Sequence, residues 1–112
     1  MSEITFIELP EFKKDLKKLT KKYPSLLRDL EIRKSVLAIF PEGRGSDVDQ
    51  IPDLKIVSKI YKARIFCKSL NRDSLRLIYC YEKDKTRIIL IEIYFKGEQN
   101  LEDRERISKN FR

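Results

Sequence analysis

The sequence predicts an α+β fold in which an N-terminal strand and a helical hairpin pack on an antiparallel sheet of three to four strands, followed by a short C-terminal helix. Apolar residues between Phe12 and Leu37 recur at helical spacing. Three later segments, between Ile60 and Lys96, mix β-branched or aromatic residues with Lys or Arg at alternating positions, as strands do. The length of 112 residues suits one compact domain, residues 1–112, and is too short for two ordinary domains.

The first strand is predicted at residues 4–9, where apolar and polar residues alternate weakly before Pro10. A helix is predicted from Glu11, with an apolar stripe made of Phe12, Leu16, Leu19 and Tyr23. Lysines fill the other faces of this helix. They could form a nucleic-acid-binding arm, but lysines around a helix with one apolar stripe are more often a solvated face, which is the interpretation we favour.

A second helix is predicted between Pro24-Ser25 and Phe40-Pro41, because proline favours the start of a helix and interrupts its interior. Its apolar positions are Leu26, Leu27, Leu30, Val36 and Leu37. Two consecutive helices with a short connection predict a hairpin. Residues 41–52 have the composition of a loop, and Gly43-Arg44-Gly45 lacks the spacing and the Lys-Ser/Thr of a P-loop, which favours a turn.

Three strands are predicted around residues 60–64, 74–79 and 91–96. The polar segments Asn71-Arg72-Asp73 and Glu82-Lys83-Asp84-Lys85 lie between them and are the expected hairpin turns. Short turns between successive strands predict antiparallel pairing. Residues 99–112 are dense in charge with few apolar residues, which predicts a short and marginal last helix.

The charge of the chain is concentrated in its second half. The formal net charge is +7 and the pI is about 9.5. The excess is greatest in residues 55–76, where only Asp73 opposes the seven cations Lys55, Lys59, Lys62, Arg64, Lys68, Arg72 and Arg76. Such a patch favours a polyanion through counterion release, so Lys55, Lys59, Lys68 and Arg72 are predicted to contact RNA. A solvated basic face is the alternative.

Several classes of protein are disfavoured by composition. The chain has no His, and Cys67 and Cys80 lack metal-ligand spacing, so we predict no metal site and no cofactor. No stretch approaches about 18 uninterrupted apolar residues, and the N-terminus does not have the pattern of a signal peptide. We therefore expect no membrane association and a cytoplasmic location, where the two cysteines would be free and reduced.

The strand that begins at Ile60 has two different faces. Lys62, Arg64 and Lys68 share one parity, whereas the other parity, expected to face the core, is occupied by Tyr61, Ala63, Ile65 and Cys67. The strand that ends near Lys96 places Glu92, Tyr94 and Lys96 at alternating positions. A sheet built from these strands would hold cations on one surface above an apolar layer.

The order of strand, helical hairpin, loop, three-stranded meander and C-terminal helix resembles the RelE/ParE superfamily of bacterial and archaeal toxins along nearly the whole chain. The resembling segments are the helix from Phe12 to Tyr23 with its Asp-Leu-Lys-Lys-Leu core, Ile60-Tyr61-Lys62-Ala63-Arg64, Arg76-Leu77-Ile78-Tyr79 and Tyr94-Phe95-Lys96. The resemblance implies one of two activities. RelE-like members cut mRNA in the ribosomal A site, whereas ParE-like members poison DNA gyrase without being nucleases, and an antitoxin holds both inactive. Fold alone does not decide between them.

We favour the RelE-like activity, a ribosome-dependent endoribonuclease that inhibits translation. Attack by the ribose 2′-OH on the scissile phosphate needs a base, stabilisation of the phosphorane charge and an acid for the leaving 5′-oxygen. Without histidine these roles fall to Lys, Arg, Tyr, Glu or the ribosome. The expected partners are the ribosome, its mRNA and an acidic antitoxin segment that covers the cations as a helix or an added strand.

The resemblance also assigns the candidate catalytic residues. Lys62 and Arg64 match the paired basic residues of the RelE branch, one as base and the other as phosphate ligand. Arg76 matches the arginine that opens the next strand, where its guanidinium could clamp the phosphate, and a salt bridge to Glu82 or Glu92 is the structural alternative. Lys96 matches the basic position after the last strand.

Tyr94 and Glu92 are the remaining candidates. Tyr94 could stack on a base or be packed, and Glu92 could be a general base or, more commonly for a strand carboxylate, a partner of a nearby cation. One departure from the best-known RelE pattern concerns the leaving-group acid. That pattern has an Arg directly after the Lys96 position and a Tyr a few residues later, whereas this chain has Gly97 and then Asp103. The departure favours the ParE-like alternative, a non-enzymatic gyrase inhibitor.

Overall fold

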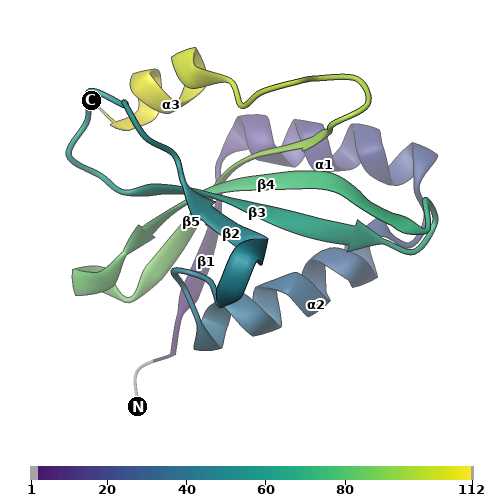
Figure 1. Ribbon diagram of the computed structural model, residues 1–112, viewed down its shortest axis with the longest axis horizontal. Coiled ribbons are helices and arrows are strands. Elements are labelled where there is room, and N and C mark those ends of the chain that lie inside the picture. The colour runs from purple at the N-terminus through teal and green to yellow at the C-terminus, as the bar shows by residue number, and fades with distance from the viewer. Residues whose placement is uncertain (1–2, 112) are drawn as a thin grey trace.

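A five-stranded sheet forms the centre of the computed structural model, which describes residues 3–111 apart from the side chain of Asp73. Its strands are β1 (Thr5–Glu8), β2 (Val48–Gln50), β3 (Ile60–Cys67), β4 (Arg72–Glu82) and β5 (Arg87–Phe95), in the spatial order β1-β5-β4-β3-β2 (Figure 1). The meander from β3 to β5 is antiparallel, as predicted. The α+β fold class is therefore confirmed.

The sheet is larger than the sequence predicted. β1 lies at one edge and pairs with β5 in parallel, with Phe6 opposite Ile88. β2 lies at the other edge within residues 41–52, which the sequence predicted to be a loop. A strand of three residues has too short a local pattern to be recognised, and β2 forms because its backbone pairs with β3.

Three helices cover the sheet. α1 (Pro10–Lys22) and α2 (Leu26–Ile39) form the predicted hairpin on one face, and α3 (Arg104–Phe111) packs on the other (Figure 1). Pro10 occupies the first turn of α1, where a missing backbone N–H costs nothing. Within residues 3–111 no helix has both the length and the apolarity needed to cross a membrane.

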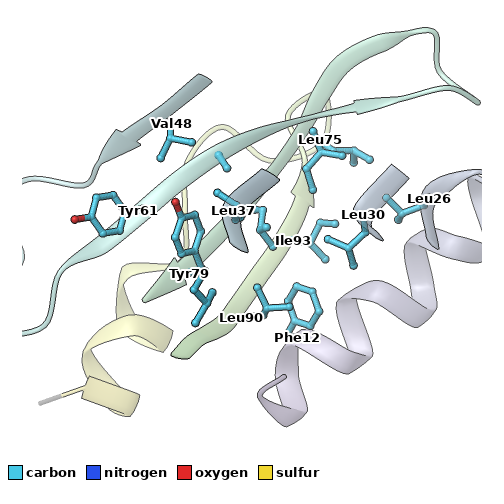
Figure 2. Close-up of a cluster of buried hydrophobic side chains, with 14 of the residues drawn as sticks. Phe12, Leu26, Leu30, Leu37, Val48, Tyr61, Leu75, Tyr79, Leu90 and Ile93 are labelled. Carbon is cyan, nitrogen blue, oxygen red and sulfur yellow. The ribbon is translucent and has the colours of Figure 1, made fainter. Parts of the chain in front are cut away.

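The larger core lies between the helical hairpin and the sheet. Phe12 of α1 packs beside Leu90 of β5, and Leu37 of α2 lies near the stacked rings of Tyr61 and Tyr79 (Figure 2). The two ring centroids are 5.5 Å apart. Both tyrosines also hold the chain after α2, because Tyr79 Oη donates to the carbonyl of Pro41 and Tyr61 Oη donates to a carboxylate oxygen of Glu42. These bonds attach the start of the connection between α2 and β2 to the sheet.

The apolar residues of α2 are divided between two surfaces. Leu26, Leu30 and Leu37 are buried against the sheet, whereas Leu27 and Val36, the other two predicted apolar positions, are 56% and 39% exposed. The helix has apolar residues all round, so its periodicity did not identify the buried side. Its outward apolar surface also includes Ile32, Ile39 and Phe40.

A β-bulge in β5 changes which residues of this strand face α3. Ile78 pairs with Glu92 and Tyr79 pairs with Leu90, so Ile91 is an extra residue on β5. A second, smaller core lies between α3 and the sheet, and Ile89 and Ile91 face it up to the bulge, whereas Tyr94 faces it after the bulge. Tyr94 therefore lies on the same side of the sheet as its cross-strand neighbour Arg76.

One of the two predicted hairpin turns differs in detail from the prediction, and the other is confirmed. The turn between β3 and β4 uses residues 68–71 and ends at Asn71, whose φ is 52°, so Arg72 and Asp73 lie in β4 instead of in the turn. Asparagine tolerates this left-handed conformation better than most residues. The predicted turn after Glu82 is confirmed as a short 3₁₀ helix, Lys83–Lys85.

Candidate functional site

A pocket of about 220 Å³ lies on the face of the sheet opposite the helical hairpin. It gathers cations from β3, from β4 and from the residue that follows β5. Five of the six predicted catalytic residues line it, namely Lys62, Arg64, Arg76, Tyr94 and Lys96. The remaining lining residues are Asp47, Asp49, Asn100 and Leu101.

The strand register explains why these side chains meet. Arg64 of β3 is directly opposite Arg76 of β4, and Arg76 is directly opposite Tyr94 of β5. Cross-strand neighbours of this kind have Cβ atoms about 5 Å apart. Lys62 precedes Arg64 by two residues and so lies on the same face, and Lys96 follows Tyr94 in the same way. The backbone N–H of Lys96 donates to the carbonyl of Ser74 at 2.8 Å, which continues the pairing beyond β5.

Arg76 is the most buried cation of the pocket. It is 9% exposed, and its Nη1 donates to the carbonyl of Leu75 at 3.1 Å. Glu82, one of the two carboxylates considered as a structural partner, is paired with Arg87 and lies six residues further along β4, about 20 Å away. A guanidinium held at the floor of a pocket presents its donors in a fixed fork that suits a phosphate.

Lys62 is paired with a carboxylate that the sequence did not indicate. Its Nζ lies 2.5 Å from Oε1 of Glu102, whose side chain is 2% exposed. Partial burial by itself would lower the pKa of Lys62, but the hydrogen bond to Glu102, the charges of Tyr94 and Glu102 and a hydrogen bond with Tyr94 together raise this pKa above its ordinary value. Lys62 is therefore a cation at neutral pH, which disfavours the role of general base that the family resemblance offered it.

Tyr94 lies between the pocket and the second core. The residue is 5% exposed and packs with the apolar side chains beneath α3, so little of its ring face is open for stacking on a base. Burial raises the pKa of the Tyr94 phenol, and the nearby Lys62 charge opposes that rise only in part. The phenol therefore keeps its proton at neutral pH and can serve as a hydrogen-bond donor.

Glu92 does not line the pocket. It is 3% exposed and accepts hydrogen bonds from Gln99 Nε2 at 2.7 Å and from the backbone N–H of Asp103 at 2.8 Å. Burial raises its pKa, and these two hydrogen bonds oppose the rise. With each carboxylate oxygen accepting a bond from the chain after β5, Glu92 serves to hold that chain, and the geometry does not support the role of general base.

The four cations predicted to contact RNA lie outside the pocket. Lys55 and Lys59 are exposed before β3, and Lys68 and Arg72 are exposed at the opposite end of β3 and the start of β4. Nine residues separate Lys59 from Lys68 along the strand, which corresponds to about 30 Å. These cations lie close together in the sequence, but the structure places them in two separate groups, one at each end of β3.

Sequence reasoning missed the acidic and C-terminal residues of the site. Asp47 and Asp49 reach the pocket because β2 pairs with β3, which sets Asp49 opposite Lys62. Asn100 and Leu101 reach it because the chain after β5 crosses back over the sheet before α3. The only signal in the sequence was the cluster of charges in each segment, and it did not indicate where they would lie.

The departure at Gly97 has a structural cause. A Cβ atom at this position would lie 2.6 Å from Cε2 and Cζ of the Phe95 ring, which itself packs edge-on against Tyr23. Asp103, near the place of the missing tyrosine, is exposed and accepts a hydrogen bond from the backbone N–H of Arg106. Neither Gly97 nor Asp103 can therefore take the role of the arginine or the tyrosine that the RelE pattern has near these positions.

The arrangement can bind and polarise a phosphate group. Four cations and a phenol converge on one hollow, and two carboxylates border it. No group of three or more Cys, Asp or Glu side chains in the described part of the chain is arranged to hold a metal ion. The cations and the phenol that line the pocket can stabilise negative charge and transfer protons.

Comparison with known proteins supports the fold. No protein-family model and no curated protein matches the sequence. Among solved structures, the chain is similar to one in the crystal structure of the archaeal RelE–RelB complex from Pyrococcus horikoshii OT3, with a TM-score of 0.61 and 18% sequence identity. The likeness covers 86% of this chain and 98% of the other. At this level of identity it shows a shared fold, and the RelE-like fold expected from the sequence is confirmed.

Proposed function

We propose that this chain is the toxin of a toxin–antitoxin pair and that it cleaves mRNA on the ribosome. The observation that carries this proposal is the convergence of Lys62, Arg64, Arg76 and Lys96 on one pocket of a RelE-like fold. A pocket lined by four cations suits the phosphate backbone of an RNA. The proposed target places the protein in the cytoplasm.

The charged residues of the pocket and Tyr94 each have a role in the proposed reaction. Arg64 and Arg76 bind the scissile phosphate and stabilise the charge that develops on it, and Lys62 and Lys96 contribute further positive charge. The 2′-OH loses its proton as its oxygen bonds to phosphorus, and the bond to the 5′-oxygen breaks. Tyr94, whose phenol is protonated at neutral pH, gives a proton to that 5′-oxygen. Asp47 and Asp49 supply a carboxylate that accepts the 2′ proton.

The antitoxin is proposed to be an acidic segment that covers the pocket and extends onto apolar surface. The similar solved structure is a complex of RelE with RelB. In this chain the exposed apolar residues Ile32 and Val36 of α2 lie beside Phe66 of β3, which is 52% exposed. β2 pairs only with residues 61–63 of β3, so the edge of β3 beyond Ala63 has no neighbouring strand among the described residues. An acidic and partly apolar segment would suit this combination.

The proposal is tested by inducing the chain in a bacterial host and mapping mRNA ends by primer extension. The same message without its start codon serves as the untranslated control. Cuts confined to the translated message are expected, and cuts in both messages, or growth without cuts, would contradict ribosome-dependent cleavage.

Arg76 provides the matched substitution. Arg76→Gln removes the charge and the guanidinium but keeps a polar side chain, and we expect growth arrest and cleavage to fall by about 100-fold or more if the residue stabilises the transition state. Lys14→Gln removes an exposed cation of α1, away from the pocket, and is expected to behave as the wild type. Thermal unfolding of both variants separates loss of function from loss of fold.

Gyrase inhibition is the second candidate function. The positive charge of Lys62 is offset by the carboxylate of Glu102, and Gly97 stands where the resemblance leads us to expect a basic residue after Lys96. These two features reduce the cationic chemistry available for RNA cleavage. Induction that produces double-strand DNA breaks without mRNA cuts would establish this alternative in place of the nuclease.

A further inference from the structure

The chain between β5 and α3 forms one side of the pocket. Asn100 and Leu101 line the hollow, and Leu101 is 64% exposed. The next residue, Glu102, is 6% exposed and turns inward toward β3. A glutamate is rarely buried to this extent without a cationic partner, because removing its charge from water is costly.

Glu102 has two cationic partners of different character. Its Oε1 lies 2.5 Å from Lys62 Nζ, and its Oε2 lies 3.0 Å from Arg104 Nε. Arg104 has a side chain that is 46% exposed and does not line the cationic pocket, whereas Lys62 is 25% exposed and lines it. The carboxylate therefore connects the chain between β5 and α3, which we call the crossing segment, to Lys62 of the pocket.

The crossing segment does not depend on Glu102 alone for its position. Glu92 accepts a hydrogen bond from the backbone N–H of Asp103, and Lys22 of α1 forms a 3.1 Å ion pair with Glu98. Arg106 further ties α3 to Asp15 of α1 at 2.6 Å. With anchors on both sides of Glu102, the contact between Glu102 and Lys62 is available for a role within the pocket.

We propose that Glu102 is a positioning residue that holds Lys62 in the pocket as a fixed ammonium, so that Lys62 acts on the scissile phosphate as a cation. This inference rests on the proposed mRNA cleavage and adds to it a residue that the family resemblance does not assign. The ion pair fixes the direction of a long and otherwise mobile side chain before RNA arrives. The ion pair also offsets one of the four positive charges of the pocket. Glu102 therefore improves the orientation of Lys62 but weakens the attraction between the pocket and RNA.

Glu102 is thus expected to help the orientation of Lys62 and to weaken the attraction for RNA. These opposite effects distinguish a positioning role from simple attachment of the crossing segment. Glu102→Gln keeps the size and the hydrogen-bonding oxygen but removes the charge. Loss of the charge would free Lys62 and make the pocket more positive. We expect cleavage of ribosome-bound message under single-turnover conditions to slow by about tenfold or more, while the affinity for the programmed ribosome stays equal or increases. If Glu102 only attached the segment, the rate and the affinity would both stay at the wild-type value or fall together.

A second readout does not depend on cleavage. The Lys62 side chain is followed by NMR through ¹³C-labelled lysine in protein made by cell-free synthesis, with Lys62→Arg used to assign the signal. The titratable or charged groups around Lys62 in the pocket are Asp47, Asp49, Arg64, Arg76, Tyr94 and Lys96, and all of them remain in the variant. We expect the pKa of Lys62 to fall in Glu102→Gln, because the carboxylate that stabilises the ammonium is lost.

Glu98→Gln is the matched control, because it removes the charge from the exposed ion pair on the same segment. It is expected to leave the Lys62 titration and the cleavage rate unchanged. An unchanged Lys62 titration in Glu102→Gln, or cleavage at the wild-type rate, would overturn the proposal. If wild-type protein leaves the message intact, the proposed nuclease function fails, and the titration still decides whether Glu102 holds Lys62 charged.

Glu102→Asp covers the case in which Glu102→Gln does not fold. Aspartate keeps the charge but is shorter by one methylene, so it reaches Lys62 less well. Cleavage that is slower than wild type while the fold is retained supports positioning. Wild-type cleavage by Glu102→Asp overturns it.

Discussion

Arg64 of β3 and Arg76 of β4 lie directly opposite each other on neighbouring strands. Like charges in this position repel, and a bound anion relieves the repulsion. The sheet thus carries at its pocket a local arrangement that an anion would stabilise. Lys62 and Lys96 flank the pair on the same face and extend the positive surface along the strands.

Anion binding at this pair can be measured by thermal unfolding. We expect inorganic polyphosphate to raise the Tm of the wild type, because a ligand that binds the folded state alone stabilises it, by about 2.7 kcal/mol at a concentration 100 times the Kd. Arg64→Gln should reduce the shift, since Arg64 is exposed and faces the pocket. Lys14→Gln, in which the pocket is intact, should keep the full shift. Equal shifts in all three proteins would indicate nonspecific binding to the basic surface.

Gly97 is expected to be required for stability. A Cβ atom there would lie 2.6 Å from the Phe95 ring, so Gly97→Ala should lower the free energy of unfolding by about 1–3 kcal/mol through overpacking. Urea unfolding measures the change. In a Phe95→Leu background, which lacks the ring atoms, the same substitution should cost less. Gly97→Ala with wild-type stability would show that the ring moves aside freely.

Glu92 should make stability depend on pH with a particular sign. Its folded-state pKa is raised above the ordinary 4.5 because the carboxyl is buried. A raised pKa means that the folded state favours the protonated form, so this contribution to stability is present below pH 4.5 and is lost as the pH rises through the folded-state pKa. As the pH rises over that range, we expect the free energy of unfolding of the wild type to fall relative to that of Glu92→Gln. Guanidinium unfolding at a series of pH values measures this difference.

Glu102 provides the opposite case on the same segment. Burial would raise its pKa, but the hydrogen bond and charge of Lys62, with hydrogen bonds from its own backbone N–H and from Arg104, lower it below the ordinary value. Its contribution is therefore present above pH 4.5 and is lost on acidification. The stability difference between wild type and Glu102→Gln should change with pH in the opposite direction to that of Glu92→Gln. Parallel trends would contradict one of the two assignments, and the direction of the shared trend would show which one.

Arg106 is expected to hold α3 on the rest of the domain. Its Nη1 donates to Asp15 at 2.6 Å and to the carbonyl of Ile91 at 2.9 Å, and its side chain is only 12% exposed. Arg106→Met should cost about 2 kcal/mol and should increase amide hydrogen exchange in α3, because Asp15 loses its partner. Lys109→Met removes a more exposed cation of α3, 3.5 Å from Glu11, and should have little effect. Unchanged exchange in Arg106→Met would contradict this role.

The elements with strong local periodicity were predictable from the sequence. The stripe from Phe12 to Tyr23 identified α1, and the alternation of Tyr61 and Ala63 with Lys62 and Arg64 identified both faces of β3 correctly. The apolar positions predicted for α2 did not show which of them are buried, because α2 has apolar residues on more than one face and Leu27 and Val36 are exposed. Periodicity identifies a buried face only when the other faces are polar.

The candidate site was predictable in its cations and not in its carboxylates. Lys62, Arg64 and Arg76 lie on strands that are adjacent in the sequence, so alternation and hairpin pairing are enough to bring them together. Asp49 depends on a three-residue strand, and Glu102 depends on a segment without regular structure that crosses the sheet. Neither has a local pattern that indicates its partner.

By itself the sequence determined the α+β class, the order of the main elements and the face of β3 on which the cations lie, because side-chain direction follows from the covalent geometry of strands and helices. Only the tertiary structure decided which charges neutralise one another. Lys62 and Glu102 are 40 residues apart, and their contact depends on the register of β3, the bulge at Ile91 and the path of the chain after Phe95. Such a contact forms only when packing brings distant segments together, so no local pattern of residues specifies it.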